Sequence, residues 1–420
     1  MTRFTALAIG IAVLSAPVLA CAPAAGQPGR AAVSATPESF GARGDGVADD
    51  SAALQKALNA GGTVHLTAGR QYRITHRIFV PSGAGMTSDG GMAWIVIGTR
   101  PGEFGDRTDF GLYVNNATGV TLQNFGLRLE YRDPAYVHGI GVLSSSNVTI
   151  KGLEIKDFAE LYGVIVRGSH DVTLDGNYVH DFRINAAPDC GLDPPARVPT
   201  SSDRPDGSCG KVIGLKVEPG RNGDAWVESY NVRITNNRIE NLKVGPEFER
   251  LWGYQSEAIN VASPQDSDAL PVTWLSHDIL ISGNRIRNVG IGINSYSLRA
   301  RIVGNTIENP AKFGIELIHG AQDNLVQGNV INRPAYAGIY VRGSPKERTV
   351  RGNVVTGNTV TGVGQDGLPH PHGDWAGFGH YAVYCQNATD TTVGANVVQG
   401  APDGALLDRC VGTRASPPGR

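Results

Sequence analysis

Six stretches of the chain repeat one pattern, which limits the fold more than any other feature of the sequence. Each has alternating apolar residues, a Gly/Asn pair at its middle and a second short alternating run. Because alternation with a period of two is typical of strands, the pattern predicts pairs of short β-strands joined by turns. The stretches are residues 171–182, 231–242, 278–289, 299–310, 323–334 and 348–360.

The spacing of these stretches predicts a solenoid. A period of 20 to 50 residues indicates repeats that bury their apolar faces only against their neighbours. We expect the middle asparagines to form a ladder at a turn, where their amides bond coil to coil. They are Asn177, Asn237, Asn284, Asn305, Asn329 and Asn353, and the last three steps are 21, 24 and 24 residues.

The composition argues against a nucleic-acid partner. The formal net charge is −2, and the sequence contains no cluster of Lys and Arg. Binding to nucleic acid requires a basic patch or stripe. The 55 glycines among 420 residues and a charged fraction of only 18% instead suit many tight turns between short strands.

The first 21 residues are expected to be an export signal. Arg3 supplies the positive charge, residues 6–20 are apolar, and residues 18–21 form a small-residue cleavage region. The apolar run is shorter than the ~20 residues of a membrane span. Residues 18–21 also resemble a bacterial lipoprotein box, in which Cys21 is lipidated. The protein is therefore predicted to be secreted or periplasmic, or anchored to the cell envelope through Cys21, with residues 22–37 as a flexible tether.

Four cysteines remain if Cys21 is removed or lipidated, and an even number suits disulfide pairing in an oxidising compartment. Cys190 and Cys209 bracket an insertion, whereas Cys385 and Cys410 bracket the final turn. We expect the two local pairings, Cys190–Cys209 and Cys385–Cys410.

Residues 38–75 have a signature of their own. Asp49 or Asp50 can cap a helix with one apolar face, which ends at Gly61-Gly62, and residues 63–66 then alternate as a strand. The carboxylates of Asp45, Asp49 and Asp50 suit turns and a helix cap better than a calcium loop. The sequence therefore requires no cofactor, although it leaves Ca²⁺ open.

Residues 40–66, FGARGDGVADDSAALQKALNAGGTVHL, resemble the N-terminal segment of the pectate-lyase-like superfamily. The resemblance implies an all-β fold, a single-stranded right-handed parallel β-helix capped at one end by a helix at residues 50–60. Together with the repeats it covers residues 38–410. Its members include lyases, polygalacturonases and epimerases, so it does not specify an activity. We expect one monomeric β-helix domain over residues 38–410 and a disordered tail over residues 411–420.

A second phrase recurs between the repeats and is predicted to be the first strand of each coil. Alternation along a strand separates residues that face the interior from residues that face outward. The expected inward row is Ile140, Val164, Leu215, Ile259, Ile291, Ile315 and Ile339. The expected outward rows are Gly141, Ile165, Lys216, Asn260, Gly292, Glu316 and Tyr340, and, two residues on, Arg167, Glu218, Ala262, Asn294, Ile318 and Arg342.

Three insertions, residues 183–211, 243–256 and 363–381, each precede a first strand. We expect them to rise from one edge and to wall a groove over the first-strand face, because long loops on a regular scaffold often carry function. The last insertion contains His370, His372 and Asp374, which are expected to be exposed loop residues and not a metal site.

The resemblance places active residues on, or just before, the first-strand face. The candidate catalytic residues are Lys216, Glu257 and Glu316. The candidate substrate-binding residues are Arg167, Glu218, Asn260, Asn294, Tyr340, Arg342, His380 and Tyr381. The polygalacturonase signatures Asn-Thr-Asp, Asp-Asp, Gly-His-Gly and Arg-Ile-Lys are missing from the equivalent strands, which argues against an ordinary polygalacturonase.

Two reactions on an acidic polysaccharide fit these residues. β-Elimination needs a base for the C5 proton and cations for the uronate carboxylate; Lys216 could be that base if its neighbours lower its pKa. Hydrolysis needs two carboxylates, ~6.5–9.5 Å apart for inversion, which Glu257 could form with Glu316 or Glu218. We expect a polysaccharide lyase, with a glycoside hydrolase or a non-catalytic glycan-binding β-helix as alternatives. A shielded first-strand face would favour the binding protein.

Overall fold

The computed structural model describes most of the chain beyond residue 34. The described residues are 35–98, 103–104, 109–130, 137–158, 161–184, 212–223, 225–244, 256–262, 276–344, 349–364 and 379–415. The chain divides into residues 1–32 and residues 33–420, and all described residues belong to the second unit. The export signal, Cys21, Cys190, Cys209 and the His370–Asp374 segment lie outside the described residues, as do most of the tether and most of the three insertions.

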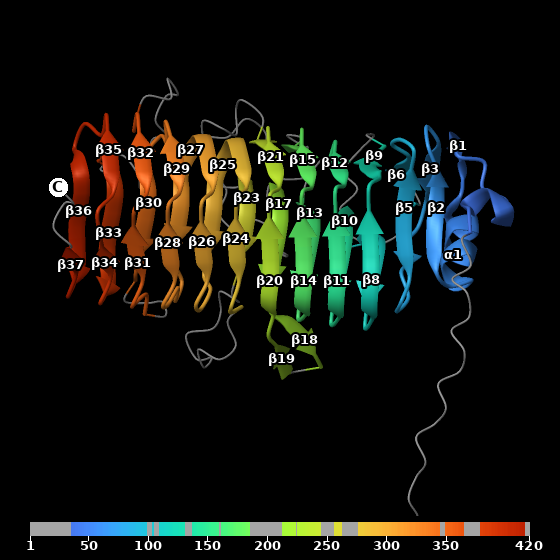
Figure 1. Cartoon of the computed structure of the whole chain (residues 1–420), viewed down its shortest axis with the longest axis horizontal. Coiled ribbons are helices and arrows are strands. Elements are labelled where there is room, and N and C mark those ends of the chain that lie inside the picture. Colours follow the sequence, from blue (N-terminus) through green and yellow to red (C-terminus); the bar gives the residue numbers. More distant parts are fainter. Residues whose placement is uncertain are drawn as a thin grey trace, which may run out of the picture. The chain divides into compact units, whose positions relative to one another are not determined.

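Successive coils of three short strands form parallel sheets (Figure 1). The first strands are β4 (Ile78–Phe79), β7 (Asp109–Asn115), β10 (Val137–Leu143), β13 (Leu161–Arg167), β17 (Val212–Glu218), β23 (Ser256–Val261), the second halves of β25 (Arg285–Ser295) and β27 (Thr306–Leu317), β30 (Ala337–Arg342), β33 (Tyr381–Thr389) and β36 (Gly404–Val411). Each pairs in parallel with the first strand of the next coil. This confirms the predicted parallel β-helix.

The other two strands of each coil form ladders of the same kind. The second strands are β2 (Thr63–Thr67), β5 (Gly85–Asp89), β8 (Thr118–Gln123), β11 (Ser146–Lys151), β14 (His170–Asp175), β20 (Tyr230–Thr235), β24 (Leu280–Ser282), β26 (Arg301–Val303), β28 (Leu325–Gln327), β31 (Val354–Thr356), β34 (Thr392–Val393) and β37 (Arg414–Ala415). The third strands are β1 (Asp45–Asp49), β3 (Gln71–Ile74), β6 (Trp94–Ile97), β9 (Gly126–Leu129), β12 (Glu154–Lys156), β15 (Tyr178–His180), β21 (Arg238–Glu240), the first halves of β25 and β27, β29 (Val330–Asn332), β32 (Thr359–Thr361) and β35 (Val397–Gln399).

The inward row of the first strands fills the interior, with one correction to the predicted register. Ile259 pairs with Ile293, and Ile293 pairs with Ile315, so Ile293 and not Ile291 belongs to this row. The segment 289–296 contains the alternation Gly-Ile-Gly-Ile, which fits either register by pattern alone. The correction moves Asn294 into the outward row beside Asn260, and Tyr296 takes the place predicted for Asn294.

A glycine or alanine precedes the inward residue in most first strands and turns the chain at that point. A Cβ atom on Gly314 would lie 2.6 Å from the Ile331 side chain and 2.7 Å from the Gly338 carbonyl oxygen, so this position has no room for a side chain. Because the glycine and the next residue both face the interior, the residue before the glycine faces outward. The bend therefore adds a third outward row, which includes His138, Tyr162 and Glu257.

The asparagine ladder is present and crosses seven coils. At each of the six steps between them, the main-chain N–H and the Nδ2 group of one asparagine donate to the Oδ1 atom of the next at 2.9–3.0 Å. Its members are Asn177, Asn237, Asn284, Asn305, Asn329, Asn358 and Asn396. The prediction for Asn353 was wrong, because it receives the Asn324 amide at another turn. Residues 348–360 contain two Gly-Asn pairs, and the pattern alone could not choose between them.

The two ends of the β-helix are closed differently. Helix α1 (Ser51–Asn59), after the 3₁₀ helix η1 (Pro37–Phe40), buries Leu54 and Leu58 against β2, β3 and β4, as predicted for the capping helix. At the other end Cys385 and Cys410 form the predicted disulfide. Strand β37 lies within the segment assigned to a disordered tail, so the last coil extends to Ala415. Within the described residues no helix is long and apolar enough to span a membrane.

The ladder predicts a large cost for removing one of its buried asparagines. Asn305→Ala leaves the main-chain N–H and the Nδ2 group of Asn284 without their acceptor. Each buried donor left unpaired costs ~1–3 kcal/mol, so we expect a loss of about 3 kcal/mol in the free energy of unfolding. Denaturant unfolding measures it, with Gln327→Ala, at an exposed position of neighbouring β28, as the control. Equal stability of the two variants would contradict the role of the ladder.

Candidate functional site

A group of charged and aromatic side chains lies on the first-strand face over three coils. We call Arg167, Lys216, Glu218, His138 and Tyr162 the Lys216 cluster. Lys216 Nζ lies 2.6 Å from Glu218 Oε2, donates to the Tyr162 hydroxyl at 3.1 Å, and lies 4.4 Å from the centre of that ring. Arg167 Nε donates to Glu218 Oε1 at 2.6 Å. The structure thus brings together three residues that the sequence analysis selected.

The electrostatics of the Lys216 cluster exclude the base role that was considered for Lys216. Burial opposes the charged form, but the Glu218 carboxylate and the Tyr162 phenol outweigh it and raise the pKa of Lys216 to about 12. Burial likewise opposes the charged form of Glu218, and Lys216 and Arg167 outweigh it and lower the pKa of that carboxyl. Lys216 therefore stays protonated at neutral pH and acts through its charge.

His138 and Tyr162 are members of this cluster that sequence reasoning missed. His138 stacks between Phe110, at 5.0 Å, and Tyr162, at 4.6 Å, and its Nδ1 atom is buried without a hydrogen-bond partner. Burial, followed by the charges of Arg167 and Lys216, lowers the pKa of His138 to about 3. Both residues stand directly before the glycine of a first strand, so the bend was the signal that could have identified them.

The other two candidate catalytic residues lie around a second lysine, Lys312 in β27. Burial lowers the pKa of Lys312, and the carboxylates of Glu316 and Glu257 oppose this shift. Lys312 Nζ also lies 4.9 Å from the centre of the Phe313 ring. Lys312 was not selected from the sequence, because it precedes the first-strand phrase of its coil. Glu257 and Glu316 therefore approach one ammonium group, apart from the Lys216 cluster.

Glu257 organises the two asparagines of the outward row. Asn260 Nδ2 donates to Glu257 Oε2, and Asn294 Nδ2 donates to Glu257 Oε1 at 3.1 Å. The Oδ1 atoms of both asparagines are buried without a donor. Because Lys216 pairs in register with Asn260, and Asn260 with Asn294, this group continues the row that begins at Lys216.

The remaining selected residues lie farther along the face. Tyr340 follows Glu316 in the outward row, and burial raises the pKa of its phenol, although Arg342 opposes the shift. His380 bonds Asp403, whose Oδ2 atom accepts its main-chain N–H at 2.6 Å. Tyr381 stands edge-on to Tyr384, with ring centres 6.0 Å apart.

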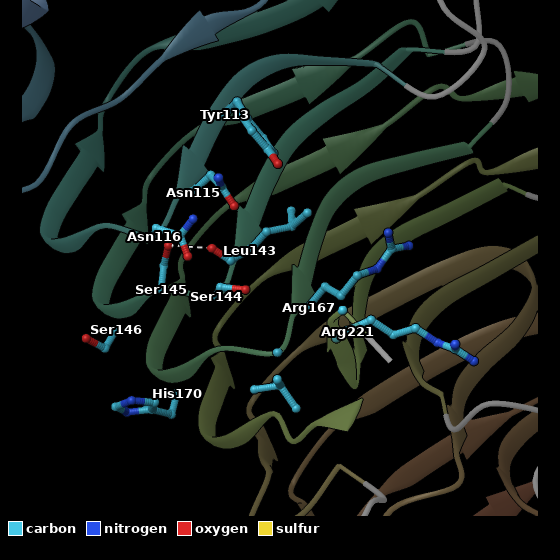
Figure 2. A pocket seen from close by; sticks show the side chains of 14 residues that line it. Tyr113, Asn115, Asn116, Leu143, Ser144, Ser145, Ser146, Arg167, His170 and Arg221 are labelled. Carbon is cyan, nitrogen blue, oxygen red and sulfur yellow. Dashed lines mark hydrogen bonds between the residues drawn. The ribbon is translucent and has the colours of Figure 1, made fainter. Parts of the chain in front are cut away.

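Two adjoining cavities open beside Arg167. The larger, about 500 Å³, is bounded on one side by Tyr113, Asn115 and Leu143, and Figure 2 shows these side chains with Arg167 and Arg221. The smaller, about 410 Å³, is lined by Glu218 and Trp226. Arg167, Leu143, Gly220 and Arg221 line both. The Lys216 cluster thus reaches these cavities through Arg167 and Glu218, while Lys216, Glu257 and Glu316 are only 9%, 7% and 4% exposed.

The carboxylates of the three N-terminal aspartates accept hydrogen bonds from main-chain N–H groups nearby in the sequence. Asp45 Oδ1 accepts the main-chain N–H groups of Val47 and Ala48, at 2.8 Å each. The Asp50 carboxylate accepts two further main-chain N–H groups, and Asp49 accepts that of Ser51. These bonds are turn chemistry, whereas Asp50, the N-cap residue of α1, makes no side-chain hydrogen bond to the helix, so the cap expected from it is not formed.

Comparison with known proteins identifies the family. Residues 104–407 match the model described as the right handed beta helix region. The chain belongs to the right-handed β-helix family. At the level of the fold, this and the solved structures confirm the predicted membership of the pectate-lyase-like superfamily. No curated protein matches the sequence of this β-helix protein.

Solved structures similar to this β-helix protein are distant in sequence. A family 28 exopolygalacturonase of Yersinia enterocolitica has a TM-score of 0.56 at 12% identity, covering 90% of this chain and 78% of its own. The A-module of mannuronan C-5 epimerase AlgE6 of Azotobacter vinelandii has a TM-score of 0.54 at 18% identity, covering 92% of this chain and 100% of its own. The catalytic unit of a GH87 α-1,3-glucanase of Streptomyces thermodiastaticus has a TM-score of 0.52 at 14% identity, covering 94% of this chain and 69% of its own. Identities this low show a common fold.

The buried, neutral His138 predicts a specific dependence of stability on pH. Between pH 6.5 and about 3 the unfolded chain binds a proton at this position and the folded protein does not, so stability falls as the pH is lowered. His138→Phe keeps the aromatic stack and removes this loss. Relative to the wild type, the variant should gain about 1.4 kcal/mol in unfolding free energy per unit of pH below ~6. Denaturant unfolding from pH 7 to 4 tests this, and a difference that does not change with pH would contradict it.

Proposed function

We propose that this protein cleaves an acidic, uronate-containing polysaccharide by β-elimination at the Lys216 cluster. The observation that carries the proposal is a charge imbalance. Arg167 and Lys216 contribute two positive charges and Glu218 one negative charge, which leaves one positive charge at a mostly buried position. A buried charge without compensation is costly, so the site favours an anionic group such as a carboxylate. The cavities beside Arg167 provide room for a sugar chain.

The same cluster supplies groups for proton transfer. Lys216 donates to the Tyr162 oxygen and so holds the phenol beside the two cations. We assign Tyr162 as the base that removes the C5 proton, while Arg167 and Lys216 neutralise the neighbouring carboxylate. The electron pair of the C5–H bond then forms the C4=C5 double bond as the C4–O4 bond breaks. The phenolic proton of Tyr162 passes to the leaving O4 atom as the Tyr162 oxygen receives the C5 proton, which balances the reaction. Neutral His138 stacks on the Tyr162 ring from the neighbouring coil.

The names of the similar structures agree with a polysaccharide substrate. The epimerase, the exopolygalacturonase and the glucanase are each named for a polysaccharide, and two of those names denote uronate polymers. We also propose that the protein is exported and acts as a monomer, as its N-terminal residues and single repeat domain led us to expect.

Two alternatives have observations of their own. Glu257 and Glu316 both approach Lys312, and a pair of carboxylates is what glycoside hydrolysis requires. The low exposure of Lys216, Glu257 and Glu316 favours a non-catalytic glycan-binding protein. Elimination is preferred because Tyr162 is only partly buried, and Arg167 is 37% exposed beside the cavities.

Incubation with pectate, alginate and chondroitin tests the proposal. Elimination creates a conjugated double bond, which is followed by ultraviolet absorbance, and Tyr162→Phe should lower kcat by ~10²–10⁴-fold. The matched control is Tyr230→Phe, which removes a hydroxyl on the second-strand face and should leave kcat unchanged.

The products separate the candidate functions. Reducing ends without the double bond would overturn elimination in favour of hydrolysis, for which Glu257→Gln and Glu316→Gln are the inactivating variants. Binding of any of these glycans without a product would identify a binding protein. Full activity of Tyr162→Phe would reject the assignment of the base.

A further inference from the structure

A two-stranded hairpin interrupts the regular coil directly after the Lys216 cluster. Strands β18 (Gly220–Asn222) and β19 (Ala225–Val227) pair antiparallel, with Arg221 opposite Trp226. Every other strand pair of the described residues is parallel. The turn after first strands β10 and β13 is short, so the hairpin is an addition that the solenoid itself does not need.

The base of the hairpin is held firmly against the neighbouring coil. A Cβ atom on Gly220 would lie 2.8 Å from the Gly168 Cα atom, so the two glycines allow a contact between main chains. Gly168 N–H donates to the Glu218 carbonyl oxygen at 3.2 Å, and the Ser229 hydroxyl donates to the same oxygen at 2.8 Å. The hairpin therefore holds its side chains at a defined place beside Arg167.

Arg221 is the second cation of the cavities. Its guanidinium carbon lies 4.1 Å from the centre of the Trp226 ring, and among the described residues it forms no ion pair. In Figure 2 the side chains of Arg167 and Arg221 start close together and diverge toward the right of the view. Both line the two cavities, whereas Glu218, which is already bonded to Arg167 and Lys216, is the only acidic residue among the described residues of either lining.

We propose that Arg221, supported by Trp226, forms a second anion-binding subsite, so that the protein recognises two neighbouring acidic sugars together. This inference takes the class of substrate, an acidic polysaccharide, from the proposed function, and it adds a second place where that polysaccharide is bound. One anionic group binds at Arg167 and Lys216, and the group of the adjoining sugar binds at Arg221. Guanidinium groups bind carboxylates and sulfates through paired N–H donors, and the indole ring offers an apolar surface to a sugar ring.

Binding of defined oligosaccharides to the full protein tests the subsite. The probes are galacturonic acid, trigalacturonic acid and a sulfated chondroitin tetrasaccharide, measured by calorimetry. Arg221→Gln should weaken the trisaccharide at least tenfold and leave the monosaccharide, which one subsite holds, unchanged. The matched control is Arg233→Gln, an exposed arginine on β20 that should bind all three probes as the wild type does. If Arg221→Gln weakens binding of the sulfated tetrasaccharide alone, the subsite binds sulfate. If Arg221→Gln weakens binding of the trisaccharide, the subsite binds carboxylate.

The outcomes separate this inference from the proposed function. Equal binding by Arg221→Gln and Arg233→Gln would overturn the subsite, even if the wild type produces unsaturated sugars. Loss of binding in Arg221→Gln without any product from the wild type would support the subsite and reject elimination. Failure of the wild type to bind any of the three probes would overturn the subsite. Raising the salt concentration should reduce the difference between wild type and Arg221→Gln, because exposed charges are screened.

Discussion

The parallel register between neighbouring coils is the constraint on which the rest of this structure depends. Buried amides enforce it, since each asparagine of the ladder donates two hydrogen bonds to the next. A shift by one residue would turn the apolar interior row outward and the charged rows inward. The position of every functional side chain follows from this register, because a residue on one coil faces a fixed partner on the next. Lys216 lies beside Asn260 for that reason alone.

The bend before each inward residue places polar and charged side chains on the surface of this regular scaffold. Glycine or alanine at the bend directs the preceding residue outward, and this places Tyr162 and Glu257 on the first-strand face. Tyr162 then meets Lys216 of the next coil, and Glu257 meets Asn294. The same small residues that close the coil therefore create the contacts of the candidate site. The candidate site is distributed over several coils, as expected for a surface that holds an extended polymer.

The charge of the first-strand face is organised into two different environments. Around Lys216 a carboxylate keeps the lysine protonated, so this lysine supplies a permanent positive charge. Around Lys312 burial prevails over two nearby carboxylates and disfavours the charged form. Sequence alone gives no means of distinguishing the two lysines, because a pKa depends on the distance to neighbouring charges and on burial. For this reason Lys216, which the sequence offered as a base, is assigned the role of a positive charge.

The repeats, the Gly-Ile phrases and the N-terminal segment were enough to determine the parallel β-helix and its capping helix, and the cysteine spacing was enough for the Cys385–Cys410 bond, because these depend on local patterns. They also identified Arg167, Lys216 and Glu218 as outward residues of neighbouring coils. The sequence could not decide between Asn353 and Asn358, or between Ile291 and Ile293, because both choices satisfy the same alternation. Only the tertiary structure, which fixes which atoms of different coils touch, revealed His138 and Tyr162 beside Lys216 and Arg221 beside Arg167.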